Sequence, residues 1–231
     1  MITANYKKIY NQVVETAIQS GRNPEEITLI AVSKTKPISA IEELIDIGVC
    51  EFGENKVQEL CEKYEQVSKP VHFHLIGHLQ TNKVKYVVDK ACLIHSVDSL
   101  KLAKEIQKEA AKKQVIAEVL IEVNVAEEES KFGLRIEEVI PFLQEISNFS
   151  NIHVNGLMTI APFVDNPEEN RPIFKVLKEL SVDIASKNID NVTMNVLSMG
   201  MTNDYQVAIE EGATMVRVGT GIFGERNYAQ V

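Results

Sequence analysis

The chain has 231 residues, 45% of them hydrophobic and 25% charged, with a net charge of −9. This composition is typical of a globular protein, and the negative charge gives no general attraction to nucleic acid or to an anionic membrane. Three widely spaced cysteines without a CxxC pair, no signal-type N-terminus and no long apolar run predict a cytoplasmic protein without disulfides or structural zinc.

Apolar residues at helical spacing between Ile2 and Ile18 predict an opening amphipathic helix that stops near Gly21. Charged segments with the same periodicity recur later, for example at residues 136–146. Between such segments, short apolar runs predict eight strands at residues 27–33, 49–53, 71–76, 92–97, 116–124, 152–160, 193–198 and 214–219.

The alternation of strands and helices, without a linker, predicts a parallel sheet in a single domain over residues 1–231. Eight units in roughly 200 residues fit the lower size limit of a closed (β/α)₈ barrel of the TIM type. An open doubly wound sheet is the alternative, although no GxGxxG motif follows the first strand. In a barrel, the candidate site residues lie at the C-terminal ends of the strands.

The first predicted strand ends in Lys34, within LIAVSKTKP at residues 29–37. Ile30, Val32 and Lys34 share one face because strand side chains alternate. If that face points into the barrel, the amine lies at its mouth, where poor solvation favours a nucleophilic amine that attacks carbonyl groups. A lysine that reaches solvent or pairs with Glu54 is an equal alternative.

Glycine-rich loops follow the last two predicted strands. Gly219, Thr220 and Gly221 follow the eighth strand, and residues 198–200, Ser-Met-Gly, end the seventh. Glycines let backbone N–H groups approach an anion, and these two loops are the recurrent phosphate site of such barrels, although plain connections are the alternative. Arg217 can bind the phosphate, form an ion pair or donate to a ring nitrogen. A reactive lysine beside a phosphate site suggests pyridoxal 5′-phosphate (PLP) as ligand.

The histidines allow a third hypothesis, a metal-dependent barrel hydrolase. The segment HFHLIGH brings His72, His74 and His78 close together, and two histidines on one strand face can bind a metal. No carboxylate cluster accompanies them at ligand spacing, which favours hydrogen-bonded core histidines. We therefore expect no metal.

Eight segments, in order along the chain, give the sequence a specific resemblance to a known family. They are LIAVSKTKP (29–37), FGENKVQE (52–59), HFHLIGHLQTNK (72–83), IHSVDS (94–99), KFGL (131–134), GLMTIAP (156–162), LSMGMTNDY (197–205) and VRVGTGIFGER (216–226). With them, the chain resembles the pyridoxal-phosphate homeostasis protein family, the YggS/PROSC group.

The resemblance implies an α/β barrel of pyridoxal-phosphate fold type III, similar to the N-terminal domain of alanine racemase, with an extra N-terminal helix. It implies a Schiff base on Lys34, an arginine that faces the pyridine nitrogen, and phosphate-binding turns after strands 7 and 8. The implied cofactor-binding residues are Lys34, Asn55, Ser198, Met199, Arg217, Gly219 and Thr220. Thr202 departs from a serine common in the family but keeps the hydroxyl group.

The implied function is PLP binding in intracellular vitamin B6 homeostasis, with recipient apoenzymes as possible partners, a monomeric state and no catalytic residues. Racemases with this barrel carry a further β domain, and from this sequence we expect no such domain. An arginine that faces the ring nitrogen would also weaken the cofactor as an electron sink. A PLP-dependent enzyme with weak amino-acid racemase or lyase activity is the alternative.

Overall fold

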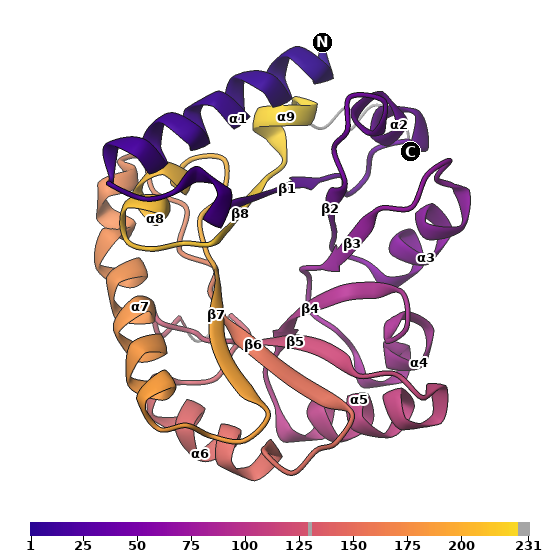
Figure 1. Cartoon of the computed structure of the whole chain (residues 1–231), viewed down its shortest axis with the longest axis vertical. Helices are drawn as coiled ribbons and strands as arrows, with labels where there is room; N and C mark the ends of the chain where they lie inside the picture. The colour runs from indigo at the N-terminus through magenta and orange to yellow at the C-terminus, as the bar shows by residue number, and fades with distance from the viewer. Residues whose placement is uncertain (129–130, 226–231) are drawn as a thin grey trace.

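Eight parallel strands form a closed barrel in chain order, and β8 returns to pair with β1. The structure is a computed structural model that describes residues 1–128 and 131–225. In Figure 1 the strands form an inner ring and the helices lie around it. The strands are β1 (Thr28–Val32), β2 (Glu51–Glu54), β3 (His72–Leu75), β4 (Ala91–Val97), β5 (Ala117–Glu122), β6 (Ile152–Met158), β7 (Val192–Ser198) and β8 (Met215–Val218).

The helices cover the outside of the barrel, and in the described residues none is long and apolar enough to cross a membrane. All eight observed strands agree with the expected ones to within two residues at each end, so the barrel prediction is confirmed. The helices are α1 (Ile2–Gln19), α2 (Ile38–Ile45), α3 (Val57–Gln66), α4 (Val84–Val87), α5 (Leu100–Lys113), α6 (Ile136–Ile146), α7 (Arg171–Ser186), α8 (Tyr205–Glu210) and α9 (Thr220–Phe223).

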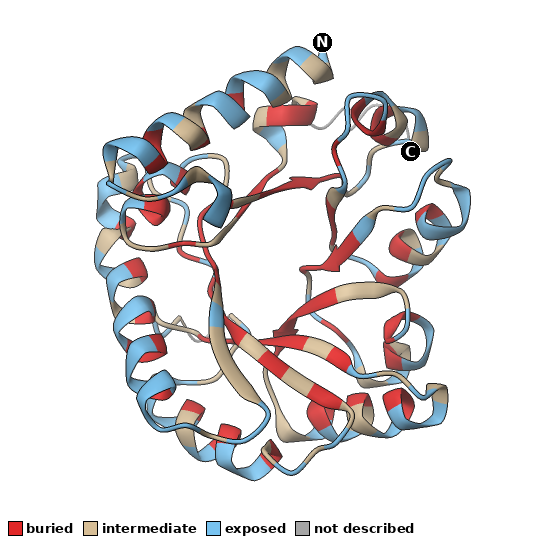
Figure 2. Ribbon diagram, viewed as in Figure 1, coloured by how far each residue is buried: buried red, intermediate tan, exposed pale blue. Residues whose placement is uncertain are grey.

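Alternation along each strand divides the apolar side chains between the barrel interior and the layer under the helices. Ile30 and Val32 pack against Ile76 inside the barrel, whereas Leu29 belongs to the larger outer core. Figure 2 shows the result: the strands are largely buried, and the helices expose their outer faces. The inward face of β1 therefore leads to Lys34, as expected from the sequence.

Helix α1 lies along the flank of the barrel, where it contacts α2, α8 and α9 (Figure 1). Its buried face includes Ile9, Val13 and Ala17. The side-chain amide of Asn5 donates to the carbonyl oxygen of Ile222 at 3.0 Å. The helix thus buries its apolar stripe over the flank of the barrel where β8 closes onto β1.

Strand β7 pairs with β8 at a single register position, Ser198 with Met215. Beyond that pair, the Met199 amide donates to the Met215 carbonyl at 3.1 Å, and the Arg217 amide donates to the Gly200 carbonyl at 3.0 Å. Gly200 has φ +88°, and a β-carbon there would lie 2.5 Å from a side chain of α8. Glycine is therefore required where the chain turns into the loop beside the end of β8.

Candidate functional site

A cavity of about 290 Å³ opens at the C-terminal ends of the strands. Residues that follow β1, β2, β3, β6, β7 and β8 line it. Five of the seven predicted site residues are among them: Lys34, Asn55, Arg217, Gly219 and Thr220. The closed barrel thus brings together residues that lie almost 190 positions apart, although their contacts with a cofactor stay predictions. Arg226, at the end of the last motif, lies outside the described residues.

Lys34 lies two residues beyond β1, is partly buried, and lines the cavity next to Val32. Lys36, which shares its strand parity, turns elsewhere: its ammonium group donates to the carbonyl oxygens of Phe223 and Gly224 at 3.1 and 3.3 Å. The structure therefore distinguishes the two lysines of the motif, and only Lys34 lines the cavity.

Charged side chains hold the residues on both sides of this lysine. The Ser33 hydroxyl donates to Glu54 at 2.6 Å, and the Thr35 amide donates to Glu59 at 2.6 Å. The Lys63 ammonium group joins the two carboxylates, at 2.7 Å from each. Thr35 has φ 62°, a conformation that is unfavourable for a β-branched residue and that its surroundings must maintain.

Asn55 enters the cavity from the loop that follows β2. Its backbone lies against Gly77, where an added β-carbon would lie only 2.4 Å from the Asn55 carbonyl oxygen. The Gly77 carbonyl in turn accepts a hydrogen bond from the Ser96 hydroxyl at 2.7 Å. The glycine of the HFHLIGH segment therefore allows the close approach of two loops that positions Asn55.

Arg217 is a buried cation at the base of the cavity, with 4% of its surface exposed. It donates to the Ser198 hydroxyl at 2.5 Å and to the Thr159 carbonyl at 2.9 Å. Burial lowers the pKa of Arg217 to about 10, and the charges of Glu122 and Asp204 oppose this shift. The guanidinium group therefore remains charged at neutral pH and can act only as a donor.

Ser198 and Met199, the other two predicted site residues, do not line the cavity. Ser198 is fully buried between the guanidinium group of Arg217 and a ring nitrogen of His95. The Met199 amide is part of the barrel ladder through its bond to Met215. In this structure Ser198 contacts Arg217, which lines the cavity, whereas Met199 is bonded to Met215, which does not.

Thr202 adds a hydroxyl group to the cavity, 3.2 Å from the hydroxyl oxygen of Thr220. In the described chain, no backbone partner is recorded for the N–H groups of Gly219 and Thr220. Gly219 has an ordinary φ of −108°, and an added β-carbon would lie 3.5 Å from Val32, an ordinary contact distance. Neither backbone conformation nor packing against the protein therefore requires glycine at this position, and the anion-binding role expected for this turn stays a prediction.

Glu122, at the end of β5, is a titratable group that sequence reasoning missed. It is 5% exposed and lines a smaller cavity together with Ile160, which also lines the main one. Burial and the nearby charge of Asp98 raise the pKa of Glu122 to about 7, while Arg217 opposes the shift. The strand pattern marks Glu122 only as a polar residue at the end of an apolar run, which is a weak signal.

The three histidines of HFHLIGH do not meet. His72 begins β3, and His74 points to the same side two residues later. His78 lies beyond the other end of β3, where its ring nitrogen is 3.4 Å from Asp98. A single ion site built on all three histidines is therefore incompatible with the structure.

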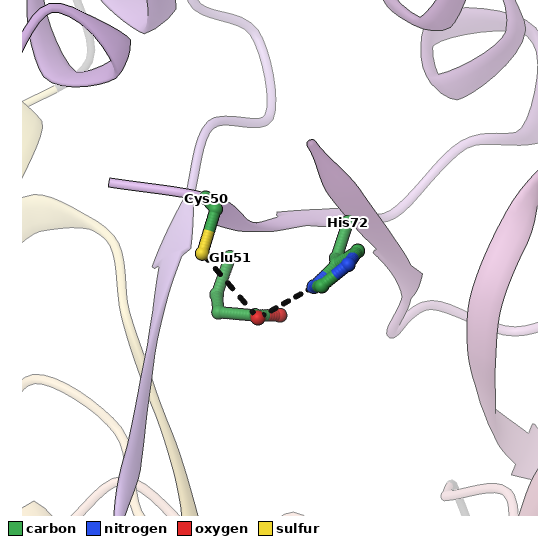
Figure 3. A group of neighbouring side chains, drawn as sticks. All are labelled: Cys50, Glu51 and His72. Carbon is green, nitrogen blue, oxygen red and sulfur yellow. Dashed lines mark hydrogen bonds and ion pairs between the residues drawn. The ribbon is translucent and has the colours of Figure 1, made fainter. Parts of the chain in front are cut away.

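His72 and His74 instead surround Glu51. The two carboxylate oxygens of Glu51 each lie 2.7 Å from a histidine nitrogen, one on His72 and one on His74. Figure 3 shows this carboxylate between Cys50 and His72, and Cys92 lies near it on the His74 side. The structure thus brings a carboxylate to these histidines that the sequence spacing did not reveal. His74 is buried and hydrogen-bonded, as expected for a core histidine, whereas His72 is exposed.

This chain, a closed (β/α)₈ barrel whose mouth holds a cavity lined by a lysine, a buried arginine and hydroxyl groups, matches a known class of protein domains, the alanine racemase N-terminal domain. The model of that family matches residues 12–227. The alanine racemase of Clostridium difficile has the same fold, with a TM-score of 0.76 at 16% identity. The match covers all of this chain and 58% of the racemase chain.

Two relatives define the family more narrowly. The pyridoxal phosphate homeostasis protein of Aquifex aeolicus is 44% identical over 222 residues, 96% of each chain. PipY of Synechococcus elongatus, whose structure was solved with PLP bound, matches with a TM-score of 0.81 and 31% identity. That match covers 92% of this chain and 100% of PipY. The chain belongs to the pyridoxal phosphate homeostasis protein family.

Proposed function

We propose that this protein binds PLP as a Schiff base on Lys34 and serves intracellular vitamin B6 homeostasis, with residues 1–231 acting as one PLP-binding domain. The observation that carries the proposal is one cavity that joins Lys34, Arg217 and the turn at Gly219 and Thr220. The family membership and the PLP-bound structure of PipY support it.

The residues of the cavity fit the chemical groups of PLP. Lys34 offers an amine for the aldehyde. Gly219, Thr220 and Thr202 offer N–H and hydroxyl donors for the phosphate. Arg217 offers a guanidinium donor for the ring nitrogen, with Asn55 beside the same pocket. We propose that the predicted turn at residues 198–199 serves the site by holding Arg217 and the neighbouring loop.

We propose binding and delivery of PLP, with recipient apoenzymes as partners, in preference to turnover. Bound PLP supplies an electrophilic aldehyde and a ring that withdraws electrons most strongly when its nitrogen is protonated. Arg217 keeps its proton at neutral pH because its pKa is about 10, so it would face an unprotonated nitrogen. That arrangement disfavours the carbanion chemistry of a racemase or lyase. A monomer in the cytoplasm is part of the same proposal.

Borohydride labelling tests the role of Lys34. The wild-type protein should show a visible absorption band with PLP, and reduction should fix one PLP to a peptide that contains Lys34. Lys34→Ala should lose the band and the adduct. Lys36→Ala is the matched control, because the Lys36 ammonium group bonds to carbonyl oxygens near α9.

Two outcomes would contradict the proposal. An adduct that persists in Lys34→Ala and disappears in Lys36→Ala would show that PLP is attached to Lys36 and not to Lys34. Steady conversion of any amino acid in a broad panel would favour the racemase or lyase alternative, provided that Lys34→Ala abolishes it.

A further inference from the structure

A line of hydrogen bonds crosses the barrel interior from the cavity toward the N-terminal side of the strands. The Arg217 guanidinium donates to the Ser198 hydroxyl at 2.5 Å, and that oxygen lies 2.9 Å from Nδ1 of His95. Nε2 of His95 lies 3.0 Å from Nδ1 of His74, whose Nε2 lies 2.7 Å from the carboxylate of Glu51. Apart from Glu51, each member is at most 4% exposed.

The cavity end of this line fixes the direction of its protons. A guanidinium group only donates, so the Ser198 oxygen accepts from Arg217. In the described chain, the only other partner recorded for that hydroxyl is Nδ1 of His95. Because Ser198 is fully buried, its own proton must go to Nδ1 or lose its hydrogen bond. Nδ1 of His95 is then an acceptor.

The Glu51 end requires the same direction. Burial alone would raise the pKa of Glu51, but hydrogen bonds from His74 and His72 lower it to about 2. The carboxylate is therefore an acceptor, and Nε2 of His74 must carry a proton. Burial holds the pKa of His95 well below its usual value, so that ring is neutral and has one N–H. With Nδ1 accepting, its proton is on Nε2 and is donated to Nδ1 of His74.

We infer that Arg217, Ser198, His95, His74 and Glu51 form a one-way hydrogen-bond chain, from a cation at the cofactor cavity to an anion across the barrel. In this chain His95 and His74 are positioning residues for Arg217. Each ring is held in the Nε2–H tautomer, so the Ser198 oxygen always has a lone pair directed at the guanidinium group. The fork of Arg217 is thus held in one orientation at the cavity base.

The consequence for the cavity rests on the proposed function. If Arg217 faces the pyridine nitrogen, its orientation determines how well PLP is bound. Glu51 touches none of the cavity, yet it terminates the chain that orients the arginine. Glu118 is a matched control because it pairs with His153 at 2.8 Å and lines the same N-terminal cavity as Glu51. The side chain of Glu118 has no recorded bond to His74 or His95 within the described residues.

Nitrogen-15 NMR of the histidine rings in the ligand-free protein at pH 7.5 tests the chain without PLP. His95 and His74 should both show a protonated Nε2 and an unprotonated Nδ1, with assignments from single histidine variants. Glu51→Ala should remove the acceptor of the His74 Nε2–H group and shift the Nε2 resonance of His74, whereas Glu118→Ala should leave the resonances of both rings unchanged. A protonated Nδ1 on His95 in the wild-type protein would overturn the inference.

PLP titration of the same variants tests the consequence. Ser198→Ala should weaken PLP binding about tenfold because a buried charged donor loses its acceptor. Ser198→Thr, which keeps the hydroxyl, should recover most of that affinity, and Glu51→Ala should weaken binding while Glu118→Ala does not. If His95 and His74 are both Nε2–H tautomers but the protein does not bind PLP, the hydrogen-bond chain stands and only the proposed function is refuted. Wild-type PLP affinity in Ser198→Ala and Glu51→Ala would refute the positioning role.

Discussion

At the scale of the residue, Glu122 makes folding stability depend on pH. Its pKa is raised to about 7, so between pH 4.5 and 7 the folded state holds a proton that the unfolded state releases. Stability therefore falls as the pH rises through this range, by up to about 3 kcal/mol from this group. Glu122→Gln, which mimics the neutral acid, should remove this component. Urea denaturation of the ligand-free wild-type and Glu122→Gln proteins at pH 5 and pH 8 measures the difference in their free energies of unfolding. The same difference at both pH values would contradict the prediction.

Residues differ in how far the sequence could predict their roles. Lys34 follows from the alternation along one strand and from the rule that function lies at strand ends, both of which are local patterns. His95, Ser198 and Glu122 act through partners on distant strands. Such contacts depend on barrel closure and register, which no spacing along the chain encodes. Sequence patterns and the family resemblance together predicted five residues that line the cavity. The phosphate role that the resemblance implied for Ser198 stays a prediction, beside a bond to Arg217 that neither revealed.

At the scale of the element, the turn after β1 depends on one buried ion cluster. Lys63 is 6% exposed and joins Glu54 and Glu59, which hold the residues on both sides of the cavity lysine. Lys63→Met should destabilise the fold by about 3–5 kcal/mol because it leaves buried carboxylate unpaired. It should also slow the reaction of PLP with the protein. Chemical denaturation and the rate of borohydride-trapped labelling measure these two effects.

The matched control for this element is Lys69→Met. Lys69 lies 3.4 Å from Asp46 in an ion pair whose side chains are 58% and 74% exposed. Exposed pairs of this kind contribute about 1 kcal/mol or less. A similar loss of stability in the Lys63 and Lys69 variants would show that the buried cluster does not support the turn. Sequence periodicity predicted β1 but not this cluster, because Lys63 looks like an ordinary charge on a helix face.

At the scale of the whole molecule, the strands of the barrel are unevenly paired, and the seam between β7 and β8 has few paired residues. Strands β5 and β6 pair at six positions, whereas β7 and β8 pair at one, and the ladder continues through the loop after β7. Strand counting from the sequence predicted a closed barrel, but it could not show where closure is weakest. That depends on Gly200 and on the register between the two strands. The proposed phosphate-binding residues Thr202 and Thr220 lie on the two sides of this seam.

A ligand held at both sides of this seam should stabilise it against local opening. Amide hydrogen exchange followed by mass spectrometry should compare two segments, residues 199–202 and residues 215–219. Residues 199–202 should exchange faster than β5 and β6 because β7 pairs with β8 at one position, whereas β8 is also held by four paired positions on β1. PLP should slow exchange in these two segments, with a smaller effect in Lys34→Ala. Protection confined to the Lys34 turn would mean that PLP is held at β1 alone. Protection at both segments would mean that the phosphate end of PLP contacts the chain on both sides of the β7–β8 seam and stabilises it.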